Sequence, residues 1–182
     1  VKVKKILCML LACVLCVSTL GGCQGEQKEP WTLEDFSVYD EDGNLVEELP
    51  EHEMIVSSKD HLYTKRKIHP DMKASEIAKV YPLENAIIRN NMDVEKTIEW
   101  QKKYKTVEDL LNSGDKFDFN DDAIEYIQIV VAFTEQNGKL EPITEYSNGY
   151  PVRNKDKNYL EMVFWINEEL EIDGISMDYK QK

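Results

Sequence analysis

The four cysteines are the residues best suited to covalent chemistry, and all of them lie in the first 23 residues: Cys8, Cys13, Cys16 and Cys23. Three of them stand in an uncharged apolar run, residues 6–20, where a thiol behaves as a small apolar side chain. Cys23 differs because it follows this run directly after two glycines, in the stretch LGGC. The position of Cys23 at the end of this segment therefore sets it apart from the other three cysteines.

The first 22 residues are arranged like a secretory signal. Three lysines precede the apolar run and small residues follow it, which is the usual order in such segments. The run is short for a helix that must cross roughly 30 Å of hydrocarbon. A secretory signal without a lipid and a short membrane anchor are the alternative interpretations.

The stretch LGGC, an aliphatic residue and two small residues before a cysteine, resembles the lipobox of bacterial lipoproteins. This resemblance covers residues 1–23. It implies diacylglyceryl transfer to the Cys23 thiol and cleavage between Gly22 and Cys23. Two acyl chains suffice for stable attachment to a membrane. We therefore expect a signal peptide at residues 1–22, followed by a lipidated cysteine and a flexible polar tether at residues 23–30, and one folded domain at residues 31–182.

The remaining residue types predict no catalytic or metal centre. The three histidines, His52, His61 and His69, lack the close spacing of a zinc motif. The seven serines after Cys23 match neither GxSxG nor SxxK. We therefore expect a protein that is not an enzyme and that has no cofactor.

Two acidic stretches could bind a cation. Residues 40–44, DEDGN, carry oxygen ligands, but their glycine is misplaced for a calcium loop and a hairpin turn is the better interpretation. Residues 115–122, DKFDFNDD, hold four carboxylates and two phenylalanines, which favour a helix-to-strand connection with the aromatic rings buried.

The elements that position these groups follow from hydrophobic periodicity. A hairpin is expected over residues 36–46, and loop with a short strand over residues 49–59. Helices are expected over residues 74–81, capped by Asp71 or Ser75, over residues 93–104, with Val94, Ile98 and Trp100 facing inward, and from Thr106 to Gly114. Strands follow at residues 126–134, 139–146, 159–167 and 170–179, the last with a bulge at Gly174. The pattern predicts an α+β fold in which short helices pack on an antiparallel sheet of at least four strands.

On the strand over residues 159–167, Tyr159, Val163 and Trp165 share the face opposite Phe164. If helices cover only the Phe164 face, this second face is a candidate binding surface with Trp165 as its anchor. If both faces are covered, the tryptophan belongs to the core.

Composition limits the partners. The formal net charge is −13, and removal of residues 1–22 takes away three lysines and no acid, which gives −16. Such a surface repels nucleic-acid phosphates, so nucleic-acid binding is excluded as a function class.

A second segment, TKRKI at residues 64–68 followed by Ser75, Glu76, Ile77 and Tyr81, resembles one found in small Gram-positive lipoproteins. There the pattern is threonine, any residue, arginine, glycine and isoleucine, then a glycine, a short helix and a tyrosine. Lys67 and Asp71 stand where the two glycines fall. The layout over residues 64–179 is similar to that of BamE/SmpA-like and β-lactamase-inhibitor-like lipoproteins. This resemblance implies protein binding rather than catalysis.

Taken together, these patterns predict a lipoprotein held by Cys23 at the extracytoplasmic face of a cell membrane. We expect a non-enzymatic interaction module with a partner protein in the cell envelope. The alternative is a lipoprotein that binds a cation, a small ligand or a cell-wall component.

Overall fold

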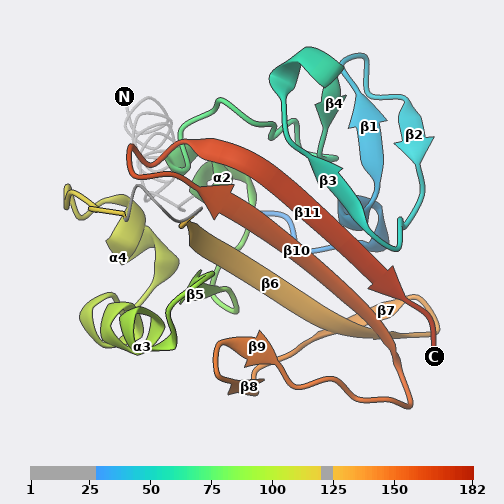
Figure 1. The fold of residues 1–182 in the computed structure, drawn as a ribbon. Helices are drawn as coiled ribbons and strands as arrows, with labels where there is room; N and C mark the ends of the chain where they lie inside the picture. Colours follow the sequence, from blue (N-terminus) through green and yellow to red (C-terminus); the bar gives the residue numbers. More distant parts are fainter. Residues whose placement is uncertain (1–27, 120–124) are drawn as a thin grey trace, which may run out of the picture.

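The computed structural model describes residues 28–119 and 125–182, so the predicted signal segment and Cys23 lie outside the described residues. Within these ranges, short helices pack on antiparallel sheets in an α+β fold, as the sequence predicts (Figure 1). The helices are α2 (Ser75–Val80), α3 (Val94–Lys103) and α4 (Val107–Leu111), with 3-10 turns η1 (Leu33–Phe36) and η2 (Ser58–Asp60). None of the described helices is long and apolar enough to span a bilayer.

The main sheet has six strands in the order β3-β11-β10-β6-β5, with β7 beside the second half of β6. Its long strands are β6 (Ile127–Gln136), β10 (Asn158–Ile166) and β11 (Ile172–Lys180). Its short strands are β3 (Glu53–Ile55), β5 (Ile87–Asn90) and β7 (Lys139–Pro142). Strand β10 pairs with β6 over its full length, from Asn158 opposite Glu135 to Ile166 opposite Ile127.

Two turn predictions are confirmed. Asn137 and Gly138 both have positive φ, 56° and 77°, as the two-residue β6–β7 hairpin requires. Between β10 and β11, Trp165 pairs with Gly174 but Ile166 pairs with Ile172, so Asp173 is the extra residue of a bulge.

Two small sheets complete the architecture. The predicted hairpin is β1 (Val38–Asp40) with β2 (Leu45–Glu47), and β4 (Leu62–Tyr63) joins the free side of β1. The predicted strand over residues 139–146 is wrong in its second half. β7 ends at Pro142, which has no N–H to donate, and the chain then leaves the sheet to form a tight pair, β8 (Tyr146–Ser147) and β9 (Tyr150–Pro151).

Helices α2 and α3 end within one residue of the predicted position, but α4 ends at Leu111, three residues before Gly114. On α3, Trp100 is buried as predicted, whereas Val94 and Ile98 are exposed, because the helix packs through Thr97 and Trp100. Helix α2 has Ala74 at its N-cap, with no side-chain cap. The Asp71 carboxylate, which we expected to cap α2, accepts a hydrogen bond from the Ser58 hydroxyl at 2.5 Å.

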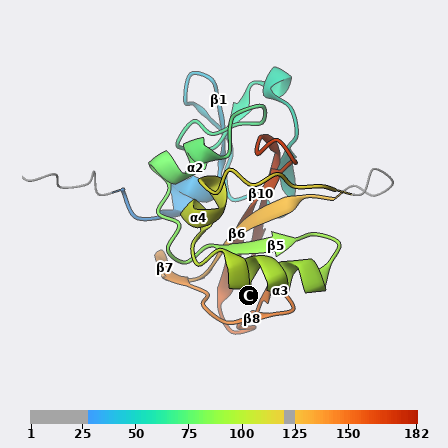
Figure 2. The same ribbon diagram turned by 90° about the vertical axis from the view of Figure 1, so that its left-hand side faces the viewer.

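The main core lies on one face of the six-stranded sheet. Leu160, Met162, Phe164 and Ile166 of β10 point into it and are fully buried. Helices α2 and α4 lie on this side of the sheet, and the described chain also begins there (Figure 2). The odd-numbered residues of β10 therefore face the other way.

The segment that resembles the Gram-positive lipoprotein pattern has an unusual backbone. Lys67 and Asp71 both take left-handed conformations, with φ of 64° and 70°. These are the two positions at which that pattern has glycine, the residue that adopts such angles most easily. Here side-chain contacts accompany the left-handed backbone, since Lys67 Nζ donates to the Glu41 carbonyl oxygen at 2.7 Å.

Candidate functional site

An open apolar hollow of about 230 Å³ lies on the sheet face opposite the main core. It is formed by strands β3, β10 and β11 and by Tyr126, the residue before β6. Its lining is mostly apolar: Met54, Val56, Tyr126, Trp165, Asp173 and Gly174. We call this feature the Trp165 hollow.

Trp165 lines the hollow and is oriented by two contacts. Its ring meets the Tyr126 ring edge to face, with centroids 5.7 Å apart, and its indole N–H donates to the Ser176 hydroxyl at 3.1 Å. The side chain is half-buried, so one part of the ring remains open to solvent. A half-exposed, oriented tryptophan is typical of an anchor in a protein interface.

The floor and the rim follow from two features of the backbone. Gly174 has no side chain, and a Cβ at this position would lie 3.4 Å from the Ile55 carbonyl oxygen and 4.0 Å from Trp165 Cδ1. Glycine therefore leaves the floor open. On the rim, Met54 and Val56 are 46% and 57% exposed, large values for apolar side chains.

Strand β3, which carries Met54, is an outermost strand of the main sheet. It pairs with β11 over only three residues, from Glu53 to Ile55. A sheet edge beside an apolar hollow can accept an extended segment of another chain, with one of its side chains in the hollow.

One acidic group borders this apolar surface. Asp173 accepts a hydrogen bond from the Asn167 side-chain amide at 3.1 Å. Burial, with a smaller contribution from Asp173, raises the pKa of the Tyr126 phenol above its usual value. The phenol is neutral at physiological pH, as an ordinary tyrosine is, and its raised pKa keeps it so into more alkaline solution.

The structure separates the three residues that the sequence placed on one binding face. Tyr159 and Val163 do lie on the same face as Trp165, but each is only 3% exposed. They cannot contact a partner in this conformation, so of the three only Trp165 is accessible. The alternative that both faces are covered holds for the half of the sheet around Tyr159.

The cover over Tyr159 comes from the connection between β7 and β10. Ile143 packs with Ala132 and Tyr159, and the Arg153 guanidinium lies 4.0 Å from the centre of the Tyr159 ring. Further along, Arg89 stacks on Tyr150 of β9 at 4.4 Å and donates to Gln128 at 2.5 Å. No residue of this connection is part of the lining of the Trp165 hollow.

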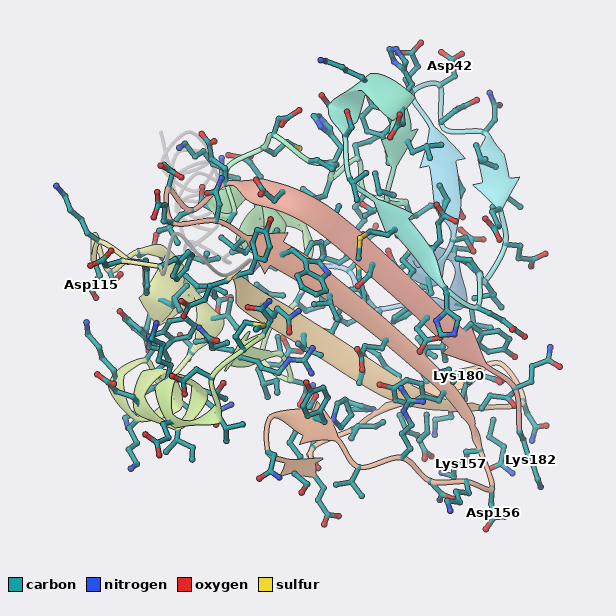
Figure 3. All side chains as sticks on the ribbon, in the orientation of Figure 1. Asp42, Asp115, Asp156, Lys157, Lys180 and Lys182 are labelled. Atoms are coloured by element: carbon teal, nitrogen blue, oxygen red, sulfur yellow. The ribbon has the colours of Figure 1, made fainter. Side chains whose placement is uncertain are left out.

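The predicted acidic loops do not come together. The Asp40 carboxylate accepts hydrogen bonds from the Asn44 backbone and side-chain nitrogens at 2.7 and 2.9 Å, which closes a hairpin turn and lowers its pKa. Asp42 at this turn and Asp115 lie on opposite sides of the molecule (Figure 3). Among the described residues, no group of three or more His, Cys, Asp or Glu side chains is placed to hold a metal ion.

The histidines are also apart from one another. His61 lies 3.1 Å from Glu41 and His52 lies 3.4 Å from Asp178, so each of these two pairs with a different carboxylate. The His69 ring contacts Tyr63 edge to face, with centroids 4.9 Å apart.

A second hollow, of about 340 Å³, lies between α3, the start of α4 and β5. Its lining mixes polar and apolar groups, among them Gln101, Thr106, Thr144 and Tyr146. The Tyr146 hydroxyl is buried and has no hydrogen-bond partner among the residues described. Burial, together with the nearby Glu161 carboxylate and against the effect of Arg89, raises the pKa of Tyr146 to about 12.

Sequence reasoning found Trp165 but missed the other members of its hollow. Met54 and Val56 alternate as strand residues do, but the stretch is too short and too charged at its start to predict its partner strand. Tyr126 was assigned to a strand without a role. In the sequence these three residues are recognisable only as apolar or aromatic residues with polar neighbours. Many buried residues have the same pattern, so it does not mark a binding site.

Comparison of this chain with protein-family models, with curated proteins and with solved structures finds no match.

Proposed function

We propose that this chain is a lipoprotein, anchored through Cys23 at the extracytoplasmic face of a bacterial cell membrane, that acts as a non-enzymatic protein-interaction module. The lipobox-like stretch LGGC supports the anchor. The Trp165 hollow supports the interaction, because an oriented aromatic ring and two exposed apolar side chains surround an open space at a sheet edge.

The partner that suits this site is a protein segment with an apolar side chain. That side chain enters the hollow against Trp165 and Gly174, and the segment runs beside β3. Basic residues around the anchor are favoured, since the chain carries a formal net charge of −13 and Asp173 borders the hollow. The only carboxylate in the lining is Asp173, and the only phenol is Tyr126. This lining is better suited to contact than to acid–base catalysis.

In-cell crosslinking identifies the partner. We expect a photoreactive benzoylphenylalanine at Met54 to give one dominant protein adduct. The same residue at Leu45, which is 53% exposed on β2 outside the lining of the hollow, should not give it. The Cys23→Ala variant, expected in the soluble fraction, shows whether the adduct depends on the anchor.

Binding of the purified partner then tests the site. We expect Val56→Lys to weaken binding at least tenfold by calorimetry, because a charge on the rim must be desolvated when the apolar anchor enters. Val46→Lys on β2 is the matched control, since Val46 is 54% exposed and lies outside the lining of the hollow. Equal affinity of Val56→Lys and the unmodified protein would refute the site.

The second hollow supports a second candidate function, the binding of a small polar ligand such as a cell-wall fragment. Its mixed lining and the unpartnered Tyr146 hydroxyl are the observations in favour. If soluble peptidoglycan fragments raise the melting temperature equally in the unmodified protein and in Val56→Lys, they bind outside the Trp165 hollow, as this candidate function requires.

A further inference from the structure

Arg66 fastens the beginning of the described chain to the domain. Its Nη1 donates to the carbonyl oxygens of Glu29 and Val80, both at 2.8 Å, and its Nη2 donates to the carbonyl oxygen of Pro30 at 2.8 Å. Its Nε and Nη2 also donate to the two carboxylate oxygens of Asp35 at 2.8 and 2.9 Å. One guanidinium thus joins the end of the tether, η1 and the end of α2.

The acid in this arrangement is buried. Asp35 is 1% exposed, and its Oδ2 also accepts hydrogen bonds from the Thr32 N–H at 2.8 Å and the Thr32 hydroxyl at 3.1 Å. A buried carboxylate without its cationic partner is strongly unfavourable. The Arg66–Asp35 pair therefore keeps the guanidinium in place, and the guanidinium keeps the tether in place.

Trp31 provides a second attachment immediately after the tether. Its ring stacks on Tyr81, with centroids 4.4 Å apart and planes at 15°, and its indole N–H donates to the Pro82 carbonyl oxygen at 2.9 Å. Tyr81 in turn contacts Phe164, whose ring lies on the core face of β10. Trp165, the next residue of that strand, points to the other face.

We propose that these contacts orient the domain on the membrane. The side that carries α2 and α4 faces the bilayer, and the Trp165 hollow points away from it, toward partners in the extracytoplasmic space. The described chain begins on the α2 and α4 side of the sheet (Figure 2). The inference rests on the proposed lipidation of Cys23, which places the lipid at the other end of the tether.

The reach of the tether supports this orientation. Six residue steps separate Cys23 from Glu29, and at about 3.6 Å per step they span at most roughly 20 Å. A domain of this size has a radius of gyration of about 15 Å, hence a diameter of roughly 40 Å and a half-circumference of roughly 60 Å. A tether that starts on one face and reaches roughly 20 Å cannot bring the opposite face to the lipid.

Paramagnetic quenching on vesicles tests the orientation. The purified lipidated protein is placed in phosphatidylcholine vesicles that contain a nitroxide-labelled headgroup. A fluorophore is attached to a cysteine introduced by Lys79→Cys on α2 or by Met54→Cys at the hollow. In the lipidated chain these are the only free thiols, because Cys23 is blocked and residues 1–22 are removed. We expect strong quenching at position 79 and at least threefold less at position 54.

A lengthened tether is the control that leaves the folded domain unchanged. Thirty Gly/Ser residues inserted between Gly25 and Glu26 allow the domain to turn over, so quenching at positions 54 and 79 should become similar. Equal quenching at both positions in the unlengthened protein, while it floats with the vesicles, would overturn the orientation alone. Failure to float with the vesicles would overturn the lipid anchor and the orientation together.

Discussion

At the residue scale, Lys67 and Asp71 adopt left-handed backbone conformations, which glycine adopts more easily than any other residue. A left-handed conformation is unfavourable by roughly 1–2 kcal/mol for a residue with a Cβ. Lys67 reaches back to the Glu41 carbonyl oxygen, and Asp71 accepts a short hydrogen bond from Ser58. These contacts offset the backbone strain and tie the segment to β1–β2 and to η2.

Substitutions at Lys67 separate the backbone strain from the side-chain contact. Lys67→Gly and Lys67→Ala both remove the bond to Glu41, but only glycine relieves the left-handed strain. We expect the glycine variant to be more stable than the alanine variant by about 1 kcal/mol in urea unfolding. At Lys65, where φ is not positive, the order should reverse, because glycine loses more entropy on folding. Equal stabilities at position 67 would contradict this account of the segment.

At the element scale, the stability of α3 depends on the contacts of its first residues, because its outer face is largely exposed and contributes little packing. The Asp93 carboxylate accepts hydrogen bonds from the backbone N–H groups of Glu95 and Lys96 at 2.8 and 3.0 Å. The Asn90 N–H donates to the Thr97 hydroxyl at 2.8 Å, which joins β5 to the helix. A second bond to the same strand comes from the Gln101 side-chain amide, which donates to the Ile88 carbonyl oxygen at 2.8 Å. The position of α3, and with it the wall of the second hollow, therefore follows from a cap and from bonds between its side chains and β5.

The N-cap of α3 can be tested without disturbing the core. We expect Asp93→Ala to lower the free energy of unfolding by about 1 kcal/mol, because two backbone donors lose their acceptor. Asp93→Ser should restore most of this loss, since serine also caps helices. A serine variant as unstable as the alanine variant would show that the carboxylate acts in some other way than as a cap.

At the scale of the whole molecule, both faces of the main sheet bury tyrosine hydroxyls. Burial is the main cause that raises the pKa values of Tyr81 on the core face and of Tyr159 on the opposite face, and Glu161 adds to the effect at Tyr159. Burial also raises the pKa of Tyr146 to about 12. The folded protein therefore keeps these three phenols neutral at a pH where the unfolded chain ionises them.

This difference predicts a loss of stability in alkali. An unfolded tyrosine releases its proton near pH 10. Above that pH the folded state binds more protons than the unfolded state, and stability falls as pH rises. We expect the melting temperature to fall above pH 10 because of Tyr81, Tyr146 and Tyr159, and to fall less steeply between pH 10 and about 12 in Tyr146→Phe. Tyr150→Phe, at a residue that is 56% exposed, is the matched control. Identical slopes for the two variants would exclude a contribution from Tyr146.

Only part of the candidate site could be predicted from the sequence, because the sequence does not show which parts of the sheet face other segments cover. Alternation along β10 placed Tyr159, Val163 and Trp165 on one face, which holds in the structure. The chain between β7 and β10 decides which of these residues are exposed to solvent. Its path depends on contacts such as the one between the Arg153 guanidinium and the Tyr159 ring. Those contacts join residues of different strands, and no local pattern records them.

The sequence by itself determined the features that depend on neighbours along the chain. These are the helix caps at Asp93 and Thr106, the turn at Asn137 and Gly138, the bulge at Gly174, and the period-two faces of the long strands. Only the tertiary structure decided the features that depend on distant segments. Strand β3 reaches β11, Tyr126 reaches Trp165, and Arg66 reaches Glu29 and Pro30. The physical reason is that caps, tight turns and the alternation of side chains depend on residues a few positions apart, whereas strand pairing and burial depend on which distant segments the whole chain brings together.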